Sequence, residues 1–198
     1  LMDTIFQLSR EETPLISNIG KEKCSNTLKE WTLDALATPS STNKQIDGFE
    51  FTADTQETPS RVSYYCQISA MQVRVTRRAN LMNTVGGKKE LARLVAKRGV
   101  ELKRDMEAVL LKNEVAAPGT ATAAPTTAGV PAWLKTNTDR GSGAGADPIL
   151  SSTTYGYPGT AAVDGTDRAL SEATVHQIVR ECFASGGRPT VIMCGLQV

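Results

Sequence analysis

The sequence has few of the residues on which specialised chemistry depends. Its 198 residues include 1 histidine, 4 cysteines and 5% aromatics, and 22 lysines and arginines almost balance 21 aspartates and glutamates. A net charge of +1 argues against a strongly basic nucleic-acid reader, and so few aromatics argue against a platform that stacks bases. No apolar run approaches the roughly 20 residues of a membrane span, so no membrane partner is expected.

The four cysteines (Cys24, Cys66, Cys182 and Cys194) are widely spaced and form no Cys-x-x-Cys pair. Neither a zinc ribbon nor a dithiol redox motif is therefore predicted. Cys66 and Cys194 fall in apolar, strand-like runs, and we interpret them as small buried hydrophobic residues. His176 stands six residues before Cys182 on one predicted helix, about 120° around its axis, so the two form no Cys–His couple. We expect no catalytic residue, cofactor or metal.

The first 42 residues predict an extended arm. Pro14 and Gly20 interrupt any longer helix, and the apolar anchors are too far apart for one packed element. Such an arm would lie along another surface through its anchors, which are Ile5, Phe6, Leu15, Ile16 and Trp31.

Residues 43–79 predict a long β-hairpin. Phe49 and Phe51 alternate in a first run, and even-numbered positions from Val62 to Ile68 alternate in a second. Met71, Val73 and Val75 continue on odd numbers, so we expect a β-bulge near Ser69–Ala70. The polar stretch Asp54–Ser60 is the predicted turn. So few apolar residues would not stabilise an isolated hairpin, which must pack on this chain or on a neighbour.

The clearest element is a helix over residues 88–113, about 39 Å long. Its apolar stripe has spacings of three, four and seven, and Lys97–Glu101 and Lys103–Glu107 are predicted i,i+4 pairs on its surface. Glu101 and Asp105 stand one turn apart, as an acid–base pair would. Because Arg98, Arg104 and Lys97 surround them, we interpret them as a solvated charge network.

The remaining sequence predicts loops, a second helix and a strand. Residues 115–168 are rich in small residues, and the stretch Gly141–Gly145 is interpreted as a flexible loop, because no strand precedes it and Asp147-Pro148 follows it. A helix is predicted over residues 171–184, capped by Ser171 and ended by Gly186-Gly187. Residues 190–194 then predict a buried strand.

Six segments in this order resemble the major capsid proteins of tailed bacteriophages, which share the Johnson fold. They are ETPLISNIGK (12–21), EWTLDAL (30–36), TPSRVSYYCQI (58–68), ELKRDMEAVLLKN (101–113), GVPAWLKTN (129–137) and GGRPTVIMCG (186–195).

The resemblance implies an α+β Johnson fold in four parts. These are an N-terminal arm (1–42), an extended β-hairpin loop (43–79), a peripheral domain with a spine helix (80–168) and the start of an axial α/β domain (169–198). Such proteins continue for about a hundred residues or more, so the resemblance also implies a chain truncated at its C-terminal end.

The implied function is that of a structural subunit of an icosahedral virion shell, without enzymatic activity. Copies of the chain would assemble in the host cytoplasm into hexamers and pentamers. Scaffolding, portal or decoration proteins are implied partners, and contact with packaged DNA would be weak and non-specific. The candidate assembly residues are Ile5, Phe6, Leu15, Ile16, Trp31, Phe49, Phe51, Tyr64 and Tyr65.

Two other functions remain open at this point. A hydrolase would use His176 or the pair Glu101 and Asp105, although no nucleophile elbow accompanies them. An extracellular adhesion or tail-fibre module would have a β-rich body and no long helix.

Overall fold

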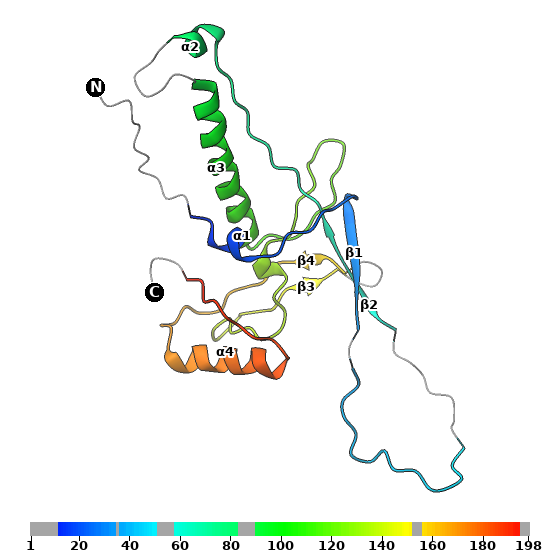
Figure 1. Ribbon diagram of the computed structural model, residues 1–198. Coiled ribbons are helices and arrows are strands. Elements are labelled where there is room, and N and C mark those ends of the chain that lie inside the picture. The colour runs from blue at the N-terminus through cyan, green and yellow to red at the C-terminus, as the bar shows by residue number, and fades with distance from the viewer. Residues whose placement is uncertain (1–11, 35, 51–57, 83–89, 152–155, 195–198) are drawn as a thin grey trace.

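The computed structural model describes residues 12–34, 36–50, 58–82, 90–151 and 156–194. Figure 1 shows a branched, mixed α and β architecture in which a long helix, a long loop and a second helix extend in different directions from a small centre. The helices are α1 (Pro14–Asn18), α2 (Arg77–Leu81), α3 (Glu90–Leu111), the 3-10 turn η1 (Val130–Ala132) and α4 (Glu172–Ala184). The strands are β1 (Leu28–Leu33), β2 (Ser60–Tyr65), β3 (Ile149–Leu150) and β4 (Pro158–Thr160). The α+β class is confirmed.

Helix α3 is the predicted spine. It has 22 residues, so it is about 33 Å long. Glu101 accepts from Arg98 at 2.6 Å and lies 3.9 Å from Lys97, which confirms the predicted Lys97–Glu101 pair and, for Glu101, the interpretation of a charge network. The predicted surface pair of Lys103 and Glu107 is wrong, because Glu107 is buried and contacts the N-terminal segment.

Strands β1 and β2 form an antiparallel ribbon in which Leu28 faces Tyr65 and Leu33 faces Ser60. The second predicted strand is thus confirmed over Ser60–Tyr65, but its partner comes from the predicted arm. Phe49 belongs to no strand, because Gly48 next to it has a positive φ of 79° in a turn, and Phe51 lies outside the described residues.

Among the described residues the ladder continues beyond β2 by one bond, from Cys66 N to the Thr27 carbonyl, so the predicted bulge near Ser69–Ala70 is wrong. Residues 67–76 then run without a described strand partner towards α2, beside the far end of α3 (Figure 1). Met71, Val73 and Val75 are half-buried while the residues between them are exposed. The alternation is therefore real, but no neighbouring strand turns it into a sheet.

The core is small and lies beyond the C-terminal end of α3. Three buried alanines, Ala116, Ala128 and Ala132, pack against Tyr65, Trp133 and Tyr157. The ring of Tyr65 meets that of Tyr157 edge-on at 5.3 Å. Strand β2 also joins this centre through its backbone, since Ser63 N donates to the Gly156 carbonyl at 3.0 Å.

Helix α4 begins and ends where the sequence predicts. The Ser171 hydroxyl accepts a hydrogen bond from Thr174 N at 3.3 Å. At the other end Gly186 has a positive φ of 85°, and Gly187 N donates to the Cys182 carbonyl at 2.8 Å. These bonds satisfy amide and carbonyl groups that the helix ends leave open.

The predicted buried strand at 190–194 is wrong. This segment has no strand partner among the described residues, and Val191, Ile192 and Met193 are exposed. An apolar run forms a strand only when another strand supplies the ladder, and the described part of the chain supplies none for this run.

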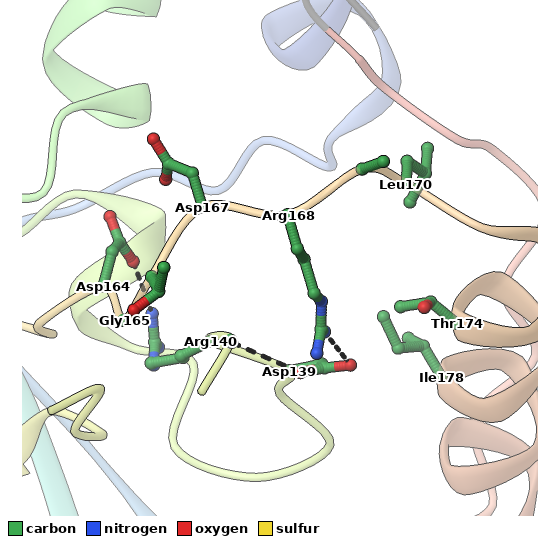
Figure 2. Close-up of a pocket in the computed structure, with 12 residues that line it drawn as sticks. Asp139, Arg140, Asp164, Gly165, Asp167, Arg168, Leu170, Thr174 and Ile178 are labelled. Atoms are coloured by element: carbon green, nitrogen blue, oxygen red, sulfur yellow. Dashed lines mark hydrogen bonds and ion pairs between the residues drawn. The ribbon is translucent and has the colours of Figure 1, made fainter. Parts of the chain in front are cut away.

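The glycine-rich loop is more ordered than predicted. Thr166 N donates to the Ser142 carbonyl at 2.9 Å, and Gly165 N donates to the Arg140 carbonyl at 2.7 Å. Figure 2 shows Arg168 reaching Asp139 and Arg140 reaching Asp164 across the open pocket between this loop and α4. The glycines allow the two backbones to approach, since a Cβ on Gly165 would lie 2.5 Å from the Ser142 oxygen.

Candidate assembly surface

A buried carboxylate fixes the N-terminal segment to the spine. Glu107 of α3 accepts hydrogen bonds from Leu15 N at 2.7 Å and from Ile16 N at 2.9 Å. These amides are the first two available in α1, because Pro14 at its N-terminus has no N–H. A carboxylate at this position satisfies open donors and complements the helix dipole. The contact brings together residues 92 and 91 positions apart in the chain.

The two tryptophans of the sequence meet beside the ribbon. The ring centroid of Trp31 on β1 lies 5.8 Å from that of Trp133, which follows η1, and 5.7 Å from that of Tyr64 on β2. Trp31 keeps 38% of its surface exposed, so the cluster is open on one side. The cluster brings together the segments EWTLDAL and GVPAWLKTN. No spacing in the sequence indicates that these segments lie close together.

The segment with Trp133 is pressed against the end of the spine. A Cβ on Gly129 would lie 1.7 Å from the carbonyl oxygen of Lys112, so only glycine fits there. The Asn113 side chain donates to the Ala162 carbonyl at 2.7 Å and accepts from Ala162 N at 3.3 Å. These contacts fix the orientation of α3 relative to the centre.

The longest connection carries apolar residues into solvent. Between β1 and β2 the chain makes a wide loop away from the centre (Figure 1), and all of its described residues from 36 to 50 are exposed. Leu36 is 100% exposed and Ile46 is 79% exposed. Such side chains have no partner in the subunit core.

Helix α4 and the segment after it carry a second apolar surface. Val179 and Phe183 are exposed on α4, and Leu170 before the helix and Ile192 after it in the sequence are exposed as well. A shallow pocket on α4 is lined by Val175, His176, Val179, Arg180, Phe183 and Ala184. The amphipathic pattern thus predicted the helix, but its apolar face is covered only in part: Val175 and Ile178 are half-buried, whereas Val179 and Phe183 are exposed.

The predicted assembly residues have different positions in the structure. Leu15 and Ile16 are buried against this chain's own spine, and Tyr64 and Tyr65 are half-buried. Trp31 and Phe49 remain accessible to a neighbour. Ile5, Phe6 and Phe51 lie outside the described residues. The candidate assembly residues did not include Leu36, Ile46 or Phe183. Leu36 and Ile46 could have been found as isolated apolar residues in a polar stretch, and Phe183 as part of the apolar face of a predicted helix.

The cysteines differ from their interpretation as buried hydrophobic residues. Cys66 is half-buried and Cys194 is exposed. The Cys24 and Cys66 sulfurs lie 3.1 Å apart as free thiols. The pKa of Cys24 is lowered, chiefly because Cys66 hydrogen-bonds to it, and the same contact together with burial raises the pKa of Cys66.

The described residues provide little for catalysis. His176 lies on the exposed surface of α4, 3.6 Å from Glu172 one turn earlier on the helix. No group of three metal-ligating side chains occurs among the described residues. No helix in the part of the chain that the structure describes is long and apolar enough to cross a membrane.

A small core, an N-terminal segment docked on α3 and exposed apolar side chains characterise the described part of the chain. Comparison with known proteins identifies the family. Residues 1–198 match the family of the SU10 major capsid protein, and the chain belongs to this family of bacteriophage shell proteins.

A curated relative supports the same assignment. The chain is 35% identical over 111 residues to the major capsid protein of Escherichia phage Phieco32. The match covers 56% of this chain and 31% of the relative, so the chain spans about a third of the length of the curated relative that it matches. The predicted resemblance to phage major capsid proteins is confirmed, and with it a location in the virion.

Proposed function

We propose that this chain forms part of the wall of an icosahedral phage shell and completes its apolar burial against neighbouring copies. The observation that carries the proposal is the exposure of apolar side chains on the described part of the loop and on α4, among them Leu36, Ile46 and Phe183. Symmetric assembly would cover them, because identical subunits present the same surfaces in a closed arrangement.

Within this proposal the fold is of the Johnson type, and each part has a structural role. Residues 1–42 form the arm, 43–79 the extended loop, 80–168 the peripheral domain with α3 as its spine, and 169–198 the start of the axial domain. Strand β1 forms one side of the base of the extended loop, although it lies within the arm range. Hexamers and pentamers would form through the loop, Trp31 and α4.

The role is structural rather than enzymatic. Scaffolding, portal and decoration proteins would bind the assembled shell, and DNA would meet a nearly neutral surface, weakly and without sequence preference. An adhesion module would be β-rich without a long helix, whereas α3 has 22 residues, so we do not propose that function.

The test changes the apolar residues of the loop. Replacing Leu36 or Ile46 by Asp should leave the fold intact, because both side chains are exposed, but should prevent neighbours from covering them. Electron microscopy and sedimentation of the purified chain are expected to give rings, sheets or shells for the wild type and small species for the variants. Thr42→Asp, an exposed polar position on the same loop, is the matched control.

Two outcomes contradict the proposal. One is a wild-type chain that remains monomeric at high concentration. The other is assembly by L36D and I46D that equals assembly by T42D. A circular dichroism spectrum that matches the wild type separates loss of assembly from loss of folding.

A further inference from the structure

Two cysteines that are distant in the sequence meet at the base of the β1–β2 ribbon. Cys24 precedes β1 and Cys66 follows β2, so both lie at the end of the ribbon opposite the long loop. Cys66 N donates to the Thr27 carbonyl at 2.9 Å, which extends the ladder by one bond. This bond fixes the backbone of Cys66 beside the segment that leads from Cys24 into β1.

The sulfurs share one environment. They lie 3.1 Å apart, and the Asn26 carbonyl is 2.9 Å from the Cys24 sulfur and 3.4 Å from the Cys66 sulfur. Cys24 is exposed to solvent, whereas Cys66 is half-buried behind it. An outside reagent would therefore reach Cys24 first and would leave Cys66 close by as the second thiol.

We propose that Cys24 and Cys66 form a redox-modification site that closes into an intrachain disulfide when the protein meets an oxidising disulfide such as glutathione disulfide. The site stands on its own geometry and does not depend on the assembly role proposed above. A reducing cytoplasm would keep both thiols free, and an oxidising medium outside the cell would close them.

The chemistry is a double thiol–disulfide exchange. The Cys24 thiolate attacks one sulfur of glutathione disulfide, which forms a mixed disulfide and releases one glutathione thiolate. The Cys66 thiolate then attacks the Cys24 sulfur and releases the second glutathione. Two protein thiols are oxidised to one disulfide, one glutathione disulfide is reduced to two glutathione thiols, and the two protons lost by the protein thiols end on the two glutathiones.

The electrostatic environment determines which of the two thiols attacks glutathione disulfide first. The pKa of Cys24 is lowered chiefly by the hydrogen bond from Cys66, and the positive charge of Lys29 acts in the same direction. The thiolate is the nucleophile in this reaction, so the exposed sulfur is also the one more readily ionised.

The closed bond would hold together the base of the long loop. The sequence separation of the two cysteines is 42 residues, and the enclosed chain contains β1, the whole loop between the strands and β2. The disulfide would then keep the two ends of the loop together under a force that separates β1 from β2.

The experiment uses the full chain with Cys182 and Cys194 changed to Ser, so that only the pair remains. After reduction, the protein is incubated with glutathione disulfide and studied by intact mass and peptide mapping. The expected product has lost two hydrogens, about 2 Da, carries no glutathione and gives a Cys24–Cys66 linked peptide. Further variants, Cys24→Ser or Cys66→Ser in the same background, should not yield this product, and the variant that keeps only Cys24 should retain bound glutathione.

Three results would overturn the inference. They are a wild-type pair that stays reduced, a mixed disulfide that never resolves, and a bond that forms between chains and appears as a dimer on a non-reducing gel. Oxidation should also raise the thermal midpoint of the protein with the pair by several degrees and leave that of the Cys24→Ser variant unchanged. An unchanged midpoint in both would contradict a bond that holds the loop base.

Discussion

Replacing Glu107 by Ala should release the N-terminal segment from the spine. Its carboxylate accepts two backbone hydrogen bonds, at 2.7 and 2.9 Å, and its side chain is buried. A hydrogen bond to a charged group contributes about 1.5–3 kcal/mol. Because water will reach part of the opened site, we expect the two bonds together to be worth about 2–4 kcal/mol to the docked state.

Such a loss is large for a small element. Helix α1 has five residues and only Leu15 and Ile16 buried, so its docking rests on few contacts. A loss of about 3 kcal/mol would raise the population of the undocked segment roughly 100-fold. The spine itself should stay helical, because its own backbone hydrogen bonds are unaffected.

Amide hydrogen exchange measures this population directly. In the E107A variant the amides of Leu15 and Ile16 should exchange about 100-fold faster, while amides in the middle of α3 keep their wild-type rates. Glu107→Gln keeps one acceptor oxygen but turns an amide N–H₂ towards a second donor, so we expect an intermediate rate. Asp105→Ala, an exposed carboxylate on the same helix, is the control. Protection of Leu15 and Ile16 within twofold of the wild type in E107A would refute this reasoning.

Two further predictions concern the centre and the loop beside α4. Gly129→Ala should lower the thermal midpoint by roughly 4–8 °C, because its Cβ would lie 1.7 Å from a carbonyl oxygen at the end of α3. Gly99→Ala, with nothing within 4 Å of its Cβ, should instead stabilise α3 by up to about 1 kcal/mol, and calorimetry of both variants tests the contrast. The pKa of Asp147 is lowered by hydrogen bonds from Thr138 and Arg140, so its contribution to stability is present above the usual carboxyl range and is lost as pH falls through the depressed value. Thermal melts between pH 5 and 3 should therefore show a smaller loss of stability for Asp147→Asn than for the wild type, and equal losses would exclude this contribution.

Local signals predicted the two longer helices, α3 and α4, but not the short helices α1 and α2. The apolar stripe predicts the bounds of α3 to within a few residues. Ser171 and Gly186-Gly187 do the same for the two ends of α4. A helix closes its hydrogen bonds within its own segment, so its sequence contains most of the information needed to find it.

Contacts between distant segments were not predictable in the same way. Strand β2 was found, but the sequence did not indicate that Leu28–Leu33 would be its partner. The contact of Glu107 with the arm and that of Cys24 with Cys66 have the same character. The sequence pattern of a helix carboxylate, or of two distant cysteines, is the same whether or not these residues form a contact. The three-dimensional path of the chain determines whether the contact forms.

Sequence prediction failed for a different reason at the apolar run 190–194 and at the loop residues Leu36 and Ile46. This reason bears on function. Their hydrophobicity is real, but nothing in the described subunit covers them. The buried hydrophobic residues in the described part of the chain are small in number and mostly small in size: Leu15, Ile16, Val62, Ala116, Ala128, Ala132 and Ala162. Little apolar surface is therefore removed from water within the described residues, and such burial is the main favourable contribution to folding. In the assembly proposed above, the Trp31–Trp133 contact would position the base of the loop, and neighbouring copies would supply the burial for Leu36, Ile46 and the exposed apolar residues of α4.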